Sequence, residues 1–208
     1  MFGLAKPDLI SSPIVLCRTI QVCGFPYRTR SIPIGISSAT CSSLATNPEM
    51  TSLEIRPEQS VELLKALHIL TRDGKLNQDS RRKLKQVYHL FQFIEPLLAQ
   101  LKDKNPAFCV VDHGAGKSYL GFILVDLYLR HHAKAARMVG IETRAELVTQ
   151  TTTLANDLGF SQMQFLNESV ADSIHSSALP ERVDMVTALH ACNTATDDAI
   201  RFGLAKQA

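Results

Sequence analysis

The chain has 208 residues, 45% of them hydrophobic, which is enough for one ordinary domain with its own core plus extensions. A formal net charge of +2 neither requires nor excludes a nucleic-acid partner. No apolar run reaches the ~18 residues that a membrane span needs, so a membrane protein is not expected. The 5 cysteines are scattered without a C-x-x-C pair, which indicates free thiols in a reducing compartment and predicts no metal site.

Residues 1–52 differ in composition from the rest of the chain. No acidic residue lies between Asp8 and Glu49, Ser, Thr and Pro are abundant, and no hydrophobic periodicity persists. We interpret this segment as a disordered leader of a cytoplasmic protein. Because transit peptides are also rich in Arg and Ser and poor in acids, mitochondrial targeting by residues 1–50 is the alternative.

Residues 53–104 are predicted to form a helical N-terminal extension. A first helix should begin at Pro57 and end near Asp73, with apolar residues at helical spacing. A second should begin near Asp79, and Pro96 should kink or end it. Its basic residues could contact a phosphate backbone, although such a run is more often a solvated helix face. These residues are Arg81, Arg82, Lys83 and Lys85.

From residue 105 to residue 208, short apolar runs alternate with helical patterns. Strands are predicted at 107–112, 136–142, 163–166 and 183–190. Helices are predicted at 117–131, at 143–158 and from about 195 to the end. This alternation predicts an α/β fold with a parallel sheet built by crossover connections.

A glycine-rich turn, DHGAG at 112–116, follows the first predicted strand. In open parallel sheets, ligands bind beyond the carboxyl ends of the strands, and the next helix N-terminus favours an anionic group there. The phosphate-loop pattern fails because Val111 stands where its first glycine belongs. The dinucleotide pattern fails because Tyr119 stands where a small residue belongs. The remaining pattern is acid-x-Gly-x-Gly.

A second acid, Glu142, ends the second predicted strand in the sequence VGIETR. One crossover after a glycine loop, a carboxylate can accept hydrogen bonds from both hydroxyls of a ribose. A solvent-exposed acid or a charge at a helix N-terminus is the simpler alternative. With the glycine turn in front of it, we favour the ribose role.

Three stretches together resemble a known family: DHGAGKSYLGF, VGIETRAELV and ALHACNTATDDA. They resemble a methyltransferase-domain family of class I methyltransferases that has a DxGxGKG-type first motif and an "lHAC" fourth motif. The resemblance covers about residues 78–208. It implies a Rossmann-like fold, S-adenosyl-L-methionine as cofactor, and an unidentified methyl acceptor, for which the basic helix suggests RNA.

The resemblance also implies roles for individual residues. The methionine end of the cofactor would lie against Asp112, Gly114, Ala115 and Gly116, and the ribose against Glu142. The adenine would lie in the loop that contains Ser169 and Val170. The methyl group and the acceptor would face His190 and Asn193. Asn193 stands where an acid or glycine is more usual, and an asparagine can orient an acceptor but cannot remove its proton.

The class I fold has seven strands, and only the first four are recognised here. We therefore expect a methyltransferase domain that is incomplete at its C-terminus, transfers methyl by direct displacement if active, and leaves the fourth strand as an exposed edge. Two other functions stay open. One is a phosphate-loop-like nucleotide-binding protein that uses the sequence GKS at 116–118, and the other is a truncated, non-catalytic binding module.

Overall fold

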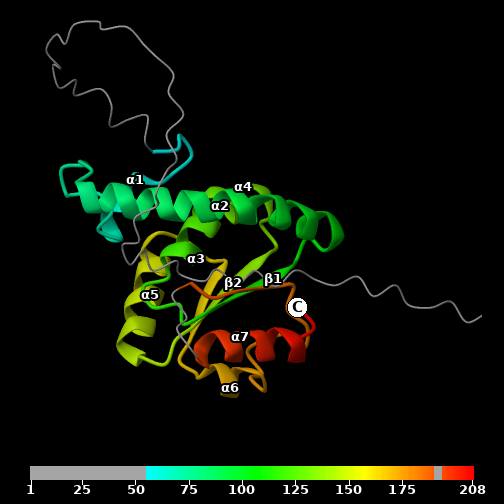
Figure 1. The fold of residues 1–208 in the computed structure, drawn as a ribbon. Helices are drawn as coiled ribbons and strands as arrows, with labels where there is room; N and C mark the ends of the chain where they lie inside the picture. The colour runs from blue at the N-terminus through cyan, green and yellow to red at the C-terminus, as the bar shows by residue number, and fades with distance from the viewer. Residues whose placement is uncertain (1–54, 190–193) are drawn as a thin grey trace, which may run out of the picture.

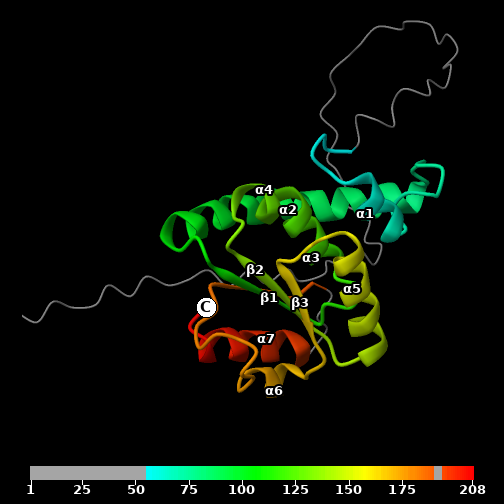
Figure 2. The ribbon, with the colours of Figure 1, turned by 180° about the vertical axis from the view of Figure 1, so that it is seen from behind.

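The computed structural model describes residues 55–189 and 194–208, which form a sheet covered by helices on both faces (Figures 1 and 2). The sheet has 4 strands in the order β3-β2-β1-β4. All three pairings are parallel. The strands are β1 (Cys109–His113), β2 (Arg137–Ile141), β3 (Met163–Leu166) and β4 (Met185–Thr187). This arrangement confirms the predicted Rossmann-like α/β fold.

Alternation along the strands produces two hydrophobic layers, because successive side chains of a strand point to opposite faces of the sheet. Val110 and Met138 belong to a core cluster shared with the helices of one face. Their neighbours Val111 and Val139 belong to a second, smaller cluster on the other face, together with Phe202. Both faces are buried, as expected for a parallel sheet.

The larger layer holds most of the helices. They are α1 (Val61–Ala66), α2 (Gln78–Lys104), α3 (Tyr119–Leu124), the π-helix η2 (Val125–Leu129), α4 (Arg130–His132) and α5 (Ala145–Asp157). The smaller layer holds α6 (Val170–Ser173) and α7 (Thr194–Ala205). Figure 1 shows α2 along the upper face of the sheet and α6 and α7 along the lower face. The helix predicted at 117–131 is thus a continuous helical segment with one π-helical turn.

The first helix is much shorter than predicted. Its N-cap is Ser60, whose side chain accepts a hydrogen bond from Leu63 N, and it ends at Ala66. The reason is the run of buried residues that follows, Leu67, Ile69 and Leu70. A continuing helix would turn Leu67 and Ile69 about 200° apart, so it could not bury both against one core. A left-handed residue, His68 with φ 55°, redirects the chain instead.

Pro96 was expected to kink or end the second helix, and it does not end it, because α2 continues to Lys104. Pro96 and Gln92, whose carbonyl loses its partner at the proline, are both exposed, so water can replace the missing bond. The buried stripe continues from Ile94, before the proline, to Leu98 and Leu101 after it. Neither α2 nor another helix in the described part of the chain is long and apolar enough to cross a membrane.

A buried ionic group attaches the segment before α1 to the helix that follows the glycine turn. Asp126, whose side chain is fully buried, pairs with Arg130 at 2.8 Å. Its carboxylate also accepts hydrogen bonds from Ser60 N at 2.9 Å and from the side chain of Gln59. Asp126 lies in the π-helical turn. The N-terminal extension therefore shares one core and one ionic contact with the sheet domain.

Candidate functional site

The turn after β1 has glycine at two positions where the backbone is left-handed. Gly114 has φ 63° and Gly116 has φ 57°, both in the left-handed region that disfavours side chains with a Cβ. Between them, Ala115 N donates a hydrogen bond of 3.1 Å to Ile141 O at the end of β2. The turn thus lies across the carboxyl edge of the sheet, and α3 begins directly after it.

Asp112 lies in β1 immediately before the turn and is only 2% exposed. It is opposite Thr187 of β4 in the parallel register. Thr187 Oγ1 donates a hydrogen bond of 2.7 Å to Asp112 Oδ1. Burial raises the pKa of Asp112 to about 7, and the hydrogen bond from Thr187 only partly opposes this effect. Asp112 is therefore a carboxyl group that can gain or lose its proton near neutral pH.

Glu142 follows β2 and is 6% exposed, but its surroundings favour the charged form, whereas those of Asp112 favour the neutral form. Gly116 N donates to its Oε2 at 2.9 Å, which joins the end of β2 to the glycine turn. Arg144 donates three hydrogen bonds, from its backbone N at 3.1 Å, from Nε at 3.0 Å and from Nη2 at 3.1 Å. The side-chain bonds from Arg144 are the main reason that the pKa of Glu142 is lowered to about 2.

A cavity of about 310 Å³ lies over this edge of the sheet. Its lining residues are Asp112, Gly114, Ala115, Gly116, Lys117, Tyr119, Leu120, Arg144 and Leu189. Glu142 does not line the cavity itself, but its two hydrogen-bonding partners, Gly116 and Arg144, do. The four residues predicted for the methionine end of a cofactor are thus together in one cavity, with Glu142 directly behind it.

The two residues predicted to lie against adenine are not among those that line this cavity. Ser169 caps α6, and its hydroxyl exchanges hydrogen bonds with Asp172, accepting from N at 3.1 Å and donating to Oδ2 at 2.6 Å. Val170 packs against the smaller core cluster. Their side chains therefore have structural roles, and adenine contact by this loop stays a prediction.

The predicted catalytic residues His190 and Asn193 lie outside the described residues. The chain leads toward them from β4 through Leu189, which lines the cavity. Three residues in or near the site were not predicted from the sequence: Arg144, Thr187 and His113. The register of a parallel sheet could have indicated Thr187 as the partner of Asp112, since both lie in apolar strands that were predicted.

His113 is a buried histidine directly after Asp112. Its ring lies edge-on against Phe202 with ring centroids 4.3 Å apart, and neither ring nitrogen has a hydrogen-bond partner among the described residues. Burial lowers its pKa to about 4. His113 is therefore neutral at physiological pH and packs α7 against the sheet on the face away from α3.

The residues that a phosphate loop would need do not lie together at the glycine turn. Ser118, the residue that would reach Mg²⁺, is 1% exposed, and its Oγ has no hydrogen-bond partner within the described chain. Asp184 lies before β4 and accepts a hydrogen bond of 2.8 Å from Cys109 N at the start of β1. It is thus at the amino edge of the sheet, opposite the glycine turn. In the described residues there is no group of three or more His, Cys, Asp or Glu side chains that could hold a metal ion.

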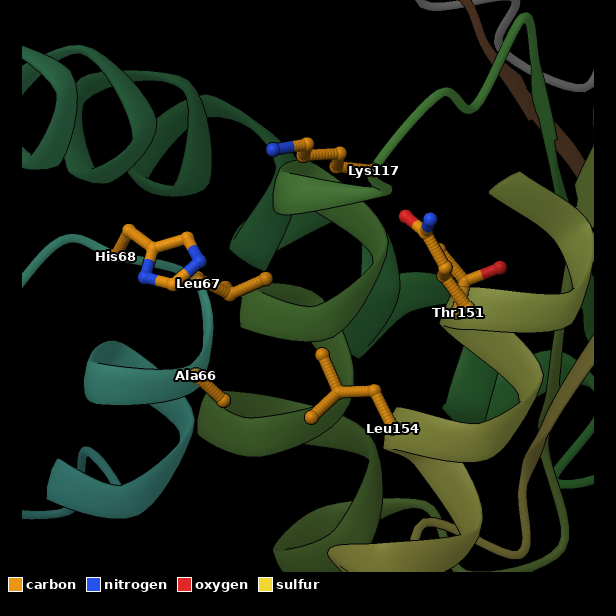
Figure 3. A pocket seen from close by; sticks show the side chains of 7 residues that line it. Ala66, Leu67, His68, Lys117, Thr151 and Leu154 are labelled. Carbon is orange, nitrogen blue, oxygen red and sulfur yellow. The ribbon is translucent and has the colours of Figure 1, made fainter. Parts of the chain in front are cut away.

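A second, smaller cavity of about 200 Å³ lies between α1, α3 and α5 (Figure 3). Its apolar wall comes from Ala66, Leu67 and Leu154, and its polar lining comes from His68, Lys117, Gln150 and Thr151. Lys117 lines both cavities, so this side chain lies at the boundary between them.

The family of the chain follows from comparison with known sequences. A family described as "Methyltransferase domain" matches residues 82–208, which include all four strands and the whole glycine turn. The chain belongs to this methyltransferase-domain family. No curated protein matches the chain in a sequence comparison.

Solved structures with similarity to this chain include three methyltransferases. Magnesium protoporphyrin IX methyltransferase from Synechocystis PCC 6803 with bound SAH is 19% identical over 64% of this chain and 54% of that chain, with a TM-score of 0.42. An rRNA methylase from Streptococcus thermophilus is 15% identical over 49% and 55%, with a TM-score of 0.39. PKMT2 from Rickettsia typhi in complex with AdoHcy is 12% identical over 49% and 19%, with a TM-score of 0.38. The chain spans at most just over half of the length of these structures.

Proposed function

We propose that the chain binds S-adenosyl-L-methionine in the cavity over the glycine turn and transfers its methyl group to an acceptor. The observation that carries the proposal is the joint position of two carboxylates and a glycine turn. Asp112 lines the cavity, and Glu142 lies behind it in contact with Gly116 N. This edge is where the strand order reverses between β1 and β4, the usual ligand position in open parallel sheets.

Groups in and behind the cavity match the methionine and ribose parts of this cofactor. The carboxylate of Asp112 is an acceptor for the ammonium group, and the paired oxygens of Glu142 are acceptors for the ribose hydroxyls. The open space above Gly114, where an added Cβ would meet nothing within 4 Å, leaves room for the methionine chain. The loop containing Ser169 and Val170 follows β3, on the side where adenine would extend.

The cofactor supplies an activated methyl group on a sulfonium, and the protein supplies binding, alignment and exclusion of water. Leu189 and Tyr119 line the cavity and would shield the reacting centre from solvent. The segment after Leu189, with His190 and Asn193, is proposed to orient the acceptor for direct displacement. Asn193 can donate and accept hydrogen bonds there but cannot serve as a general base.

Parallel titration calorimetry with S-adenosylhomocysteine and with ATP plus Mg²⁺ tests this proposal. We expect binding of S-adenosylhomocysteine at one site per chain and no heat from ATP with Mg²⁺. Binding of ATP with Mg²⁺ and not of the thioether would favour the phosphate-loop function instead. Binding of neither would favour a non-catalytic module.

For the acceptor we propose RNA, on the basis of the charge carried by α2. Arg82, Lys83 and Lys85 are exposed near its N-terminal end, and of these three only Arg82 forms an ion pair within the described part of the chain, with Asp79 at 3.8 Å. An exposed cationic helix face of this kind can neutralise backbone phosphates. The acceptor proposal is independent of the cofactor proposal, because no residue of α2 lines the cofactor cavity.

A further inference from the structure

Arg144 covers the carboxylate that is proposed to bind ribose. Its guanidinium contacts both oxygens of Glu142, with Nε 3.0 Å from Oε1 and Nη2 3.1 Å from Oε2. Arg144 lines the cavity, whereas Glu142 does not. The side chain of Arg144 is 61% exposed and that of Glu142 is 6% exposed. The guanidinium therefore lies on the cavity side of a nearly buried carboxylate.

The hydrogen bonds of Glu142 divide into two sets. Each carboxylate oxygen has two lone pairs. One on each oxygen is occupied by a backbone donor, Arg144 N on Oε1 at 3.1 Å and Gly116 N on Oε2 at 2.9 Å. Thr143 Oγ1 adds a longer hydrogen bond of 3.4 Å to Oε1, and it stays in place as the backbone donors do. The guanidinium donates one further hydrogen bond to each oxygen, and a vicinal diol would need the same two acceptor positions. A guanidinium and a ribose therefore cannot both occupy them.

We propose that Arg144 holds the ribose position closed in the cofactor-free protein, and that cofactor binding exchanges its guanidinium for the ribose diol. This inference rests on the proposed function. The exchange leaves the number of hydrogen bonds to Glu142 unchanged, since two N–H donors leave and two O–H donors arrive. The two backbone donors stay in place, so the carboxylate keeps its orientation without the guanidinium.

The displaced guanidinium loses little by leaving. The guanidinium is already largely exposed, so its hydration changes little when it leaves. Glu142 is nearly buried, so it needs the donors of the ribose to replace those of the guanidinium. The contact thus supplies donors to the carboxylate until the nucleoside arrives. Its cost appears as a lower cofactor affinity, because part of the binding free energy is used to break the ion pair.

Titration of S-adenosylhomocysteine into Arg144→Ala tests the exchange. We expect its Kd to be about threefold to fivefold lower than that of the unchanged protein, the range for loss of a partly exposed ion pair. Arg144→Lys, which keeps the charge but cannot donate to both oxygens from one plane, should lie in between. Lys134→Ala removes the same charge from an exposed position outside this cavity and should leave Kd unchanged.

An equal or higher Kd for Arg144→Ala would overturn the exchange and would mean that Arg144 helps to hold the nucleoside. Salt provides a second measurement. Raising NaCl from about 50 to about 500 mM should screen the ion pair and lower Kd in the unchanged protein. The same change should not lower Kd in Arg144→Ala, because no ion pair remains to be screened there and screening of the ammonium contact with Asp112 can only weaken binding. Failure of the proposed function looks different, because then no variant binds the thioether.

Discussion

Two carboxyl groups at the same edge of the sheet have opposite pKa shifts, and the cause is the number of donors that each one receives. Asp112 is buried with a single hydroxyl donor, so burial dominates and raises its pKa to about 7. Glu142 is nearly as buried but receives donors from Arg144 and Gly116, which lower its pKa to about 2. One group is therefore poised to titrate, and the other is charged at every physiological pH.

Removing the carboxylate of Glu142 should weaken cofactor binding. In Glu142→Ala we expect the Kd for S-adenosylhomocysteine to rise about tenfold, because two charge-assisted hydrogen bonds to ribose are lost and release of Arg144 offsets part of the loss. Calorimetry measures the change. Lys117→Ala is the comparison, because Lys117 lines the cavity but is not a hydrogen-bond partner of Glu142, and it should change Kd less. The reverse ranking of the two variants would support a phosphate loop.

The raised pKa of Asp112 predicts that cofactor affinity depends on pH. Below about pH 7 the carboxyl group is protonated and cannot hold an ammonium group, so the Kd for S-adenosylhomocysteine should fall as pH rises from about 5.5 to about 7.5. Calorimetry across this window measures the slope. Asp112→Asn should bind weakly with a flat profile, and a slope that survives in this variant would assign the titration to another group.

The same shift predicts a stability cost. The folded-state pKa of Asp112 is raised from 3.8 to about 7, so the folded protein binds the proton more tightly than the unfolded chain. Stability from this group is complete below pH 4 and is lost as pH rises to about 7, in total on the order of 4 kcal/mol. Asp112→Asn should therefore gain stability relative to the unchanged protein between pH 5 and about pH 8. Thermal unfolding of both proteins at pH 5 and at about pH 8 measures this. An equal difference in Tm between the two proteins at both pH values would contradict it.

At the scale of elements, the attachment of the segment before α1 depends on a buried ion pair with unequal partners. Asp126 has a fully buried side chain, while that of Arg130 is 34% exposed. Arg130→Ala leaves a buried charge with fewer donors and should cost about 3 kcal/mol of unfolding free energy. Asp126→Asn leaves an arginine that can reach water and should cost only about 1 kcal/mol. Urea unfolding measures both, and the opposite order would show that Asp126 matters chiefly as an anchor for Ser60 and Gln59.

The elements that local patterns define best were predicted best. β3 has the same bounds, 163–166, in sequence and structure. Its apolar residues are interrupted by Gln164, the one exposed residue of a strand that is otherwise half-buried. The first helix was predicted too long, because apolar residues at 67, 69 and 70 were assigned helical spacing although only an irregular chain buries them together. The helix at α6 was not predicted, because a single capped turn leaves no periodicity.

The same division applies to the candidate site. Strand-end acids and turn glycines are visible in sequence, so Asp112, Gly114, Gly116 and Glu142 could be named beforehand. The partners of these acids could not, because they depend on strand register and on side-chain direction. Thr187 reaches Asp112 across 75 positions, and Arg144 turns back over Glu142 only in three dimensions.

At the scale of the whole molecule, the carboxyl edge of the sheet and the N-terminal extension meet at Lys117. This residue lines the proposed cofactor cavity and also the cavity beneath α1 (Figure 3). The N-terminal end of α2, with its exposed basic residues, lies next to α1 (Figures 1 and 2). The cavity beside α1 thus adjoins the proposed cofactor cavity, and α1 in turn lies next to the basic end of α2.

This arrangement predicts salt-dependent RNA binding that is localised to one end of α2. Removing three cations together, in Arg82→Ala with Lys83→Ala and Lys85→Ala, should weaken binding of a single-stranded RNA oligonucleotide. It should also reduce the slope of log K against log salt by about 2, since each phosphate contact contributes about 0.7. Fluorescence anisotropy over a salt series measures both effects.

The matched control also removes three positive charges. It combines Lys102→Ala and Lys104→Ala, in the last turn of α2, with Lys134→Ala outside that helix. If the basic end of α2 is the contact surface, this variant should keep most of the slope, because counterions are released only where phosphates replace them. Equal losses in the two triple variants would mean that RNA responds only to net charge. In that case the acceptor proposal fails while the cofactor proposal, which depends on Asp112 and Glu142 alone, is unaffected.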